Sequence, residues 1–314
     1  MDLRTISVVA LSARDFSSLD EKLAEAVRWL ELAAGQGAEL VVFPECLNRF
    51  CGDGAANPHL QTAGADACRD WRREMRVLLE AARLRKVFVV VPVMHYDDEG
   101  LWNSFFLVSP EGEEVWRYDK ISPTPAELSD GVRPGVPKEL FDWRGVKVGG
   151  LICFDTCFPE NLDRLGREGA QLVLCSSLWP GGSQLNHFCK MNASRVALSY
   201  PAWSRIIDID GEEVIEGGYR QETLRFGFGV PVYTATLNFD RLSLYGNGNQ
   251  EQIEAILQKY GARVKVGFDQ GNGLWFLESV DPELAESEIA KEFGLVTARD
   301  YFTQCGQLIK EHGQ

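Results

Sequence analysis

Residues 39–45 read ELVVFPE, a short apolar run that ends at a proline and a carboxylate. Such a run is typical of a strand that is buried on both faces. Residues 18–34 carry apolar side chains at helical spacing, and residues 5–11 form another apolar run. A strand, a helix and a second strand in this order predict an α/β layer, with Glu45 at the carboxyl end of the second strand.

The alternation of strands and helices continues along the chain. Apolar or alternating runs predict strands at residues 87–93, 102–108, 113–118, 146–152, 171–175, 203–209 and 228–238. Helical spacing predicts helices at about 70–85, 185–198, 250–261 and 283–293, and another that opens at Pro159. The helix at 18–34 has Ser18 as its expected N-cap, with Glu21 completing a capping box. No repeat or clear linker divides these elements.

The composition restricts the class of protein. With 314 residues, 45% of them apolar, the chain can bury a large core. A formal charge of −14 argues against nucleic acid or an anionic membrane as the main partner. No run approaches the roughly 18 apolar residues of a membrane helix, and no signal peptide is recognisable at the start, so a cytoplasmic location is expected. The eight cysteines are irregularly spaced, which favours reduced thiols.

One cysteine stands where an α/β fold gathers its chemistry. Cys153 follows the predicted strand at 146–152 and precedes the Phe-Pro-Glu segment 158–160, which opens a helix. Backbone N–H groups at such a helix start can stabilise a developing oxyanion. A buried structural thiol is the alternative for a single strand-end cysteine, so the prediction depends on what lies beside it.

Two charged residues complete a possible catalytic group. Glu45 ends one strand, and Lys120 follows a hairpin whose turn contains the Pro-Glu-Gly segment 110–112. A carboxylate, a thiol and an ammonium group supply the base, the nucleophile and the oxyanion partner for acyl transfer, without a metal or other cofactor. Taken singly, each charge has an ordinary alternative as a helix cap or a solvated side chain.

Several separated segments resemble the nitrilase superfamily of carbon-nitrogen hydrolases. The three main ones are VVFPE at 41–45, YDK at 118–120 and GLICFD at 150–155, with supporting matches at Asn103-Ser104, at 110–112, at Glu127 and at 158–160. The similarity covers about residues 3–200. It implies a four-layer αββα sandwich with the active site at the strand ends.

The resemblance also implies a role for each matching residue. Glu45 would take the thiol proton and later activate water, while Cys153 would form an acyl-enzyme thioester. Lys120 would stabilise the tetrahedral intermediate, and Glu127 would be the family's auxiliary glutamate that positions substrate. Relatives commonly form dimers, so a homodimer or larger homo-oligomer is expected.

The residues after the cysteine indicate the branch of the superfamily. Phe154 and Asp155 give a Cys-aromatic-Asp pattern, which is similar to that of amidases and carbamoylases and differs from the Cys-Trp-Glu pattern of nitrilases. The expected substrate is a small amide or N-carbamoyl compound that releases ammonia or an amine. Phe154, Asp155, Trp179 and Asn48 are the candidate substrate-binding residues. One departure is that Lys120 lacks the histidine that many relatives carry two residues later.

Other functions stay open at this point. A nitrilase, an acyl transferase or a catalytically silent binding subunit would keep the same fold. A Cys-His hydrolase would use His187 as its base. A zinc site would need pairs such as Cys46 and Cys51 or Cys153 and Cys157, with His59 or His187, but none has Cys-x-x-Cys spacing, so no metal is predicted.

The resemblance weakens beyond about residue 205, and the sequence predicts two parts of unequal size. Residues 1–270 form the predicted carbon-nitrogen hydrolase domain. Residues 271–314 form a predicted C-terminal extension that packs on this domain or lies at an oligomer interface.

Overall fold

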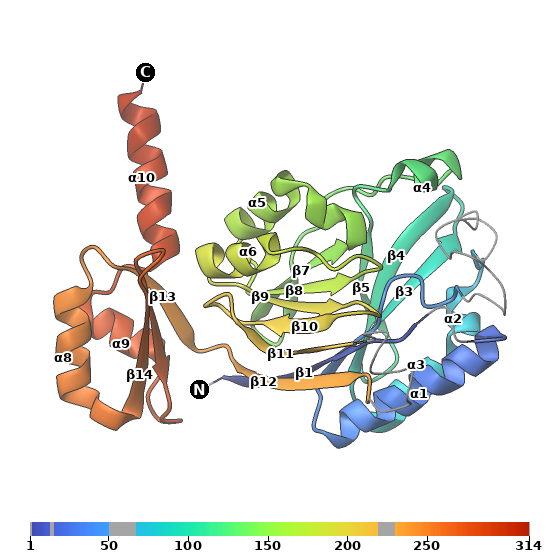
Figure 1. The fold of residues 1–314 in the computed structure, drawn as a ribbon, viewed down its shortest axis with the longest axis horizontal. Coiled ribbons are helices and arrows are strands. Elements are labelled where there is room, and N and C mark those ends of the chain that lie inside the picture. Colours follow the sequence, from blue (N-terminus) through green and yellow to red (C-terminus); the bar gives the residue numbers. More distant parts are fainter. Residues whose placement is uncertain (1, 13–15, 50–66, 219–229, 314) are drawn as a thin grey trace.

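A computed structural model describes residues 2–12, 16–49, 67–218 and 230–313. Two six-stranded sheets form the larger part of the molecule (Figure 1). The first sheet has the strand order β12 (Val232–Asn238), β1 (Leu3–Val9), β2 (Leu40–Val42), β3 (Phe88–Tyr96), β4 (Leu101–Val108) and β5 (Glu114–Asp119). The second has the order β11 (Glu213–Gly217), β10 (Ser204–Ile207), β9 (Arg195–Ser199), β8 (Leu172–Ser176), β7 (Val146–Ile152) and β6 (Phe141–Trp143).

The centre of each sheet is parallel and its edges are antiparallel. In the first sheet β2 pairs in parallel with β1 and β3, and in the second sheet β8 pairs in parallel with β7 and β9. Parallel strands place their carboxyl ends at one edge of the sheet. Glu45 and Cys153 follow the carboxyl ends of β2 and β7, so each lies at this edge of its own sheet.

The two sheets face each other and helices cover their outer faces. Alternation along β2 shows the layering, because Val42 packs in the core between the sheets and Val41 in the core beneath the helices. The outer helices are α1 (Leu19–Gly35), α2 (Trp71–Glu74) and α3 (Arg76–Arg85) on one sheet, and α5 (Pro159–Glu168) and α6 (Gln184–Asn192) on the other. The predicted four-layer αββα sandwich is confirmed.

The start of α1 has the predicted cap with one change of partner. Ser18 Oγ accepts a hydrogen bond from the N–H of Glu21 at 3.1 Å. The Glu21 carboxylate bonds the N–H and hydroxyl of Ser17, at 2.9 and 2.6 Å, where a standard capping box would use the N–H of Ser18. The N-cap prediction is therefore confirmed, and the reciprocal bond lies one residue earlier.

The predicted helix at 185–198 is wrong in its second half. Helix α6 ends at Asn192, and Ala193 adopts a left-handed conformation with φ of +47°. The chain then enters β9, which pairs with β8 and β10 and is buried along its whole length. A strand buried on both faces has no polar face to interrupt a helical pattern, so periodicity did not separate the two elements.

A small α/β unit follows the sandwich. Its sheet has the order β13 (Arg241–Tyr245), β15 (Leu274–Ser279) and β14 (Val264–Asp269), and its other elements are α8 (Gln250–Tyr260), η3 (Gly261–Arg263), α9 (Glu286–Phe293) and α10 (Ala298–His312). The predicted helices at 250–261 and 283–293 correspond to α8 and α9. Figure 1 shows α10 projecting from this unit. None of the described helices is long and apolar enough to cross a membrane.

The predicted boundary after residue 270 falls inside a hairpin. Strands β14 and β15 pair from Val264 opposite Ser279 to Asp269 opposite Leu274. A division at 270 would separate these partners. The small unit instead extends back to Arg241, the first residue of its sheet.

Candidate active site

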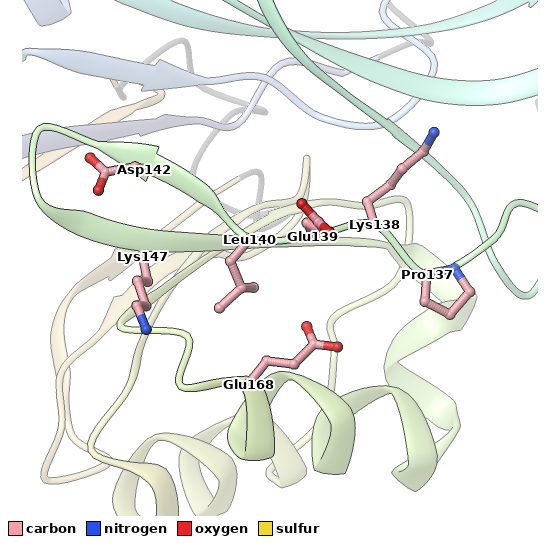
Figure 2. A pocket seen from close by; sticks show the side chains of 7 residues that line it. All are labelled: Pro137, Lys138, Glu139, Leu140, Asp142, Lys147 and Glu168. Carbon is pink, nitrogen blue, oxygen red and sulfur yellow. The ribbon is translucent and has the colours of Figure 1, made fainter.

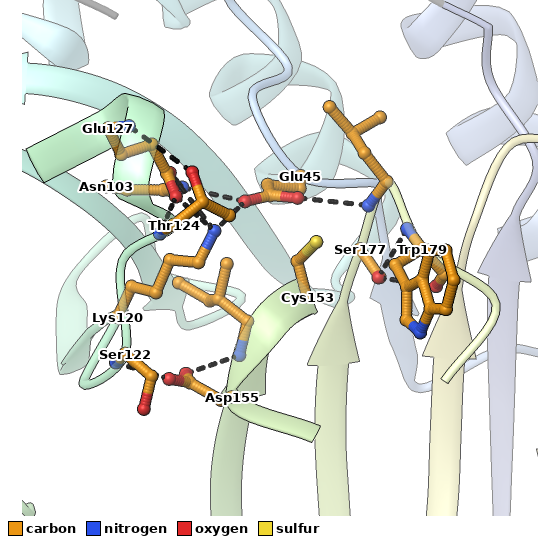
Figure 3. Close-up of polar contacts among 12 residues, drawn as sticks. Glu45, Asn103, Lys120, Ser122, Thr124, Glu127, Cys153, Asp155, Ser177 and Trp179 are labelled. Carbon is orange, nitrogen blue, oxygen red and sulfur yellow. Dashed lines mark hydrogen bonds and ion pairs between the residues drawn. The ribbon is translucent and has the colours of Figure 1, made fainter. Parts of the chain in front are cut away.

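The predicted catalytic residues meet between the two sheets. Glu45 follows β2, Lys120 follows β5, and Cys153 follows β7 in the opposite sheet (Figure 3). Lys120 Nζ lies 2.8 Å from Glu45 Oε1 and 2.8 Å from Glu127 Oε2. Residues that are 75 positions apart in the chain are thus in direct contact, because strand ends from both sheets converge here.

The Glu45 carboxylate is buried and fixed from both of its oxygens. Oε1 accepts hydrogen bonds from Lys120 Nζ at 2.8 Å and from Asn103 Nδ2 at 2.7 Å. Oε2 accepts the backbone N–H of Leu178 at 3.0 Å. The side chain is only 3% exposed. This network holds the carboxylate in one orientation beside Cys153, which is what a general base requires.

Lys120 and Glu127 form the charged half of the site. Burial alone would lower the pKa of Lys120, but the carboxylates of Glu45 and Glu127 hold it well above its ordinary value. Burial alone would raise the pKa of Glu127, but its ion pair and hydrogen bonds with Lys120 lower it. Both groups are therefore charged near neutral pH. Glu127 lies in α4 (Pro125–Ser129), where a capping box with Thr124 fixes it.

Cys153 occupies a strained turn between β7 and the short helix η2 (Cys153–Cys157). Its φ of +47° lies in the left-handed region, which non-glycine residues adopt rarely and often at functional sites. Burial and the Glu45 carboxylate raise the pKa of the Cys153 thiol well above its ordinary value, partly offset by Lys120 and by a hydrogen bond from the Leu178 N–H. The resting thiol is thus protonated beside a carboxylate, so attack requires that base.

Asn103 has a position that the sequence did not predict. Its amide nitrogen donates to Glu45 Oε1 and to Glu127 Oε1, both at 2.7 Å. It therefore spaces two carboxylates that would otherwise repel each other across Lys120. The available signal was a polar Asn-Ser pair inside the otherwise apolar strand β4.

Asn48 is not placed as a substrate-binding residue, contrary to its prediction. Its amide donates to the carbonyl of Met94 at 2.9 Å and accepts the N–H of Met94 at 3.0 Å. It is 2% exposed and also reaches Glu74 at 3.3 Å. These bonds attach the segment after Glu45 to β3. Asn48 therefore has a structural role in place of the predicted contact with substrate.

The other predicted substrate contacts divide into two groups. Asp155 is fully buried, and its carboxylate is occupied by three internal donors, so the structure also contradicts its prediction. Phe154 packs edge-to-face on Phe158 at 5.2 Å between ring centroids. Trp179 is 51% exposed and bonds Ser177 through its backbone (Figure 3). Contacts of Phe154 and Trp179 with substrate stay predictions.

The catalytic residues open onto a small cavity of about 190 Å³. Its described lining consists of Glu45, Cys46, Arg49, Lys120, Thr124, Ala126, Glu127, Asp130, Cys153 and Leu178. A larger open hollow of about 490 Å³ lies between α5 and the strands β6 and β7 (Figure 2). The described lining of that hollow consists of Pro137, Lys138, Glu139, Leu140, Asp142, Lys147 and Glu168, and it includes no thiol or hydroxyl nucleophile.

The alternative sites find little support in the described residues. His187 is exposed on α6, on the outer face of the second sheet, and does not line the catalytic cavity. No cluster of three or more potential metal ligands occurs in the described part of the chain. Cys51 and His59 lie outside the described residues.

Known proteins similar to this chain are amidases and their relatives. An (R)-stereoselective amidase from a Pseudomonas species is 33% identical over 177 residues, which are 55% of this chain and 59% of the relative. An omega-amidase from Danio rerio is 28% identical over 163 residues, 49% of this chain and 56% of the relative. The chain thus spans about half the length of these curated relatives.

A similar fold occurs among solved structures. An amidase of the nitrilase superfamily from Nesterenkonia AN1 has a TM-score of 0.61 and 22% identity, with 74% of this chain and 90% of that chain covered. The family model for carbon-nitrogen hydrolases matches residues 5–242. This match spans most of the chain and includes Glu45, Lys120 and Cys153, so the chain belongs to the carbon-nitrogen hydrolase family.

Proposed function

We propose that the protein hydrolyses the C–N bond of a small amide or N-carbamoyl compound through a thioester on Cys153. The observation that carries this proposal is the buried contact of a protonated thiol, a fixed carboxylate and a charged ammonium group. These are the nucleophile, base and electrophilic partner that acyl transfer needs. No step in this proposal requires a cofactor.

In the first step, Glu45 removes the proton of the Cys153 thiol as the sulfur attacks the substrate carbonyl carbon. The new C–S bond leaves negative charge on the carbonyl oxygen, which the ammonium group of Lys120 stabilises. The intermediate then collapses, the C–N bond breaks, and Glu45 returns the proton to the leaving nitrogen. Ammonia or an amine departs and the acyl group remains on sulfur.

In the second step, Glu45 activates a water molecule. Water attacks the thioester carbon and its proton passes to Glu45. The C–S bond then breaks to release the acid, and Glu45 gives the proton to the departing sulfur, which restores the thiol and the carboxylate. Glu127 takes no proton in either step. It holds Lys120 through bonds of 3.0 and 2.8 Å and faces the cavity, where it can position the substrate nitrogen.

Three considerations favour an amide over a nitrile. The Phe154-Asp155 pair follows the amidase pattern. The similar proteins include an (R)-stereoselective amidase and an omega-amidase. One amidase structure from Nesterenkonia AN1 carries the acetamide moiety of fluoroacetamide on its active-site cysteine. A nitrilase from Pyrococcus abyssi is also similar, at 28% identity, which keeps nitrile hydrolysis as the second candidate.

The substrate class can be tested by ammonia release. We expect the reduced protein to release ammonia from one or more members of a panel of small amides and carbamoyl compounds, and to release less from matched nitriles. A preference for nitriles would favour the second candidate. No release from any compound, with the thiol shown to be free, would favour acyl transfer or a silent binding role.

We further propose that the protein is cytoplasmic and forms a homodimer or larger homo-oligomer, with the C-terminal unit contributing to the interface. Helix α10 supports the proposed assembly because it exposes three large apolar side chains. Phe302, Leu308 and Ile309 are 39%, 52% and 72% exposed. Large apolar side chains exposed on one helix are a feature of interaction surfaces.

Sedimentation of the 314-residue chain tests the assembly. We expect a mass of at least twice that of the monomer, and a lower mass or weaker association for Ile309→Lys, because a charged side chain cannot be buried without a partner. Thr303→Lys, on another side of the same helix, is the matched control and should leave the mass unchanged. A monomer at every concentration would contradict the proposal.

A further inference from the structure

Asp155 lies two residues after Cys153 and is completely buried. Its carboxylate accepts three hydrogen bonds, from the Ser122 N–H at 2.7 Å, the Ile152 N–H at 2.9 Å and the Tyr118 hydroxyl at 2.9 Å. Figure 3 shows Asp155 below the catalytic cluster, with Lys120 on one side and Cys153 on the other. Asp155 does not line the described cavity.

The three donors are close in sequence to the two catalytic residues. Tyr118 and Ser122 lie two residues before and two residues after Lys120, while Ile152 directly precedes Cys153. Tyr118 belongs to the first sheet and Ile152 to the second. The Asp155 carboxylate therefore joins the chain that carries Lys120 to the chain that carries Cys153, across the contact between the sheets.

The sheets approach closely at this point, where Gly150 faces two aromatic rings of the first sheet. A Cβ atom on Gly150 would lie 2.8 Å from the rings of both Phe105 and Tyr118. The aromatic contacts at Gly150 are apolar and without direction, whereas three bonds to one carboxylate fix both distance and angle. The Leu178 N–H bond to Glu45 is a second directional contact between the two halves of the site. The Asn161 amide adds support by donating to the carbonyl of Asp155 at 3.1 Å.

We propose that Asp155 is a positioning residue that sets the geometry between Lys120 and Cys153 during amide hydrolysis. The inference rests on the proposed function. A misplacement of about 1 Å between a nucleophile and its partner can cost on the order of 10²-fold in rate. Loss of the carboxylate should therefore lower kcat while leaving substrate binding nearly unchanged.

The ionisation of Asp155 gives a second signature. Burial raises its pKa to about 6, offset by the Ile152 and Ser122 N–H groups, by Lys120 and by the Tyr118 hydroxyl. Two further titratable groups lie nearby: Cys175 on β8 interacts electrostatically with Asp155, and Arg164 interacts with Tyr118. Below this pKa the carboxyl group is protonated and loses acceptor capacity. The kcat of the natural enzyme should thus fall as the pH drops through about 6.

The test replaces the carboxylate without changing its shape. In Asp155→Asn the amide nitrogen meets an N–H or hydroxyl donor, so we expect kcat to fall about 10²-fold, KM to change little and the loss of rate near pH 6 to disappear. Tyr118→Phe removes one donor of three and should give the same pattern with a smaller fall. Asp208→Asn, another buried carboxylate but one that pairs with Arg195 and Arg241 in the far part of the fold, should lower the melting temperature and leave kcat unchanged.

A second measurement separates this inference from the proposed function. The alkylation rate of Cys153 by chloroacetamide reports thiol positioning without requiring turnover, and a Cys157→Ser background removes the exposed neighbouring thiol. Slower alkylation in Asp155→Asn supports positioning even if the natural enzyme hydrolyses no amide. Unchanged kcat and alkylation in folded Asp155→Asn, or in folded Tyr118→Phe if the first variant does not fold, would overturn it.

Discussion

Replacing Cys153 with alanine should abolish turnover, with a fall in kcat of at least about 10⁴-fold. The variant keeps the cavity, Lys120 and Glu45 but has no atom that can form the acyl intermediate. Ammonia release on the best substrate of the panel measures this loss. Mass spectrometry during turnover should detect an acyl adduct on the natural enzyme and none on the variant.

The control is a cysteine four residues away. Cys157 is exposed at the end of η2, and Cys157→Ser should retain the activity of the natural enzyme. Alanine at position 153 can adopt the same left-handed backbone at a similar cost, so the melting temperature of Cys153→Ala should stay close to that of the natural protein. Turnover that survives in Cys153→Ala would disprove the thioester mechanism.

The sandwich could be predicted because its central strands are apolar on both faces. Strand β7 was predicted at its observed bounds, since all of its residues except Lys147 are buried and a helix opened by a proline follows it. The same property made β9 indistinguishable from the end of α6. The left-handed Ala193 between them has no sequence signature, because alanine favours helix in nearly every context.

The small C-terminal unit was harder to predict for a different reason. Strand β13 reads RLSLY, and its Arg241 forms ion pairs with Asp208 and Asp210 of the sandwich. Its short, half-polar strands become recognisable only when β15 pairs with them. Pairing between strands more than 30 residues apart is not encoded in local periodicity.

The triad was predictable while the surrounding polar contacts were not. Glu45, Lys120 and Cys153 each follow a strand, and parallel strands gather their ends. The partners of Asn48 and Asp155 lie in other strands, at Met94 and Tyr118, so nothing adjacent in the sequence reveals that these side chains are already occupied. Asn103 went without a role for the same reason.

Replacing Glu45 with glutamine should have the second largest effect on activity. The variant loses the base for both steps, and we expect kcat to fall about 10²- to 10⁴-fold. The high pKa of the Cys153 thiol leaves little thiolate to react without that base. An amide also cannot accept bonds at both ends, so Lys120 and Asn103 on one side or the Leu178 N–H on the other will oppose a donor. The variant should therefore be about 1–3 kcal/mol less stable, measured by denaturant unfolding.

An activated ester separates the base from simple loss of structure. A p-nitrophenyl ester has a leaving group that needs no proton, so a folded Glu45→Gln enzyme should still form the thioester slowly. Without the base, water attacks that thioester poorly, and we expect about one equivalent of p-nitrophenol per active site followed by a much slower phase. Glu45→Asp is the matched control. Its shorter side chain keeps a carboxylate base, so the rate of the phase after the burst should be partly restored. Sustained turnover of the ester by Glu45→Gln at the natural rate would mean that another group, and not Glu45, activates water.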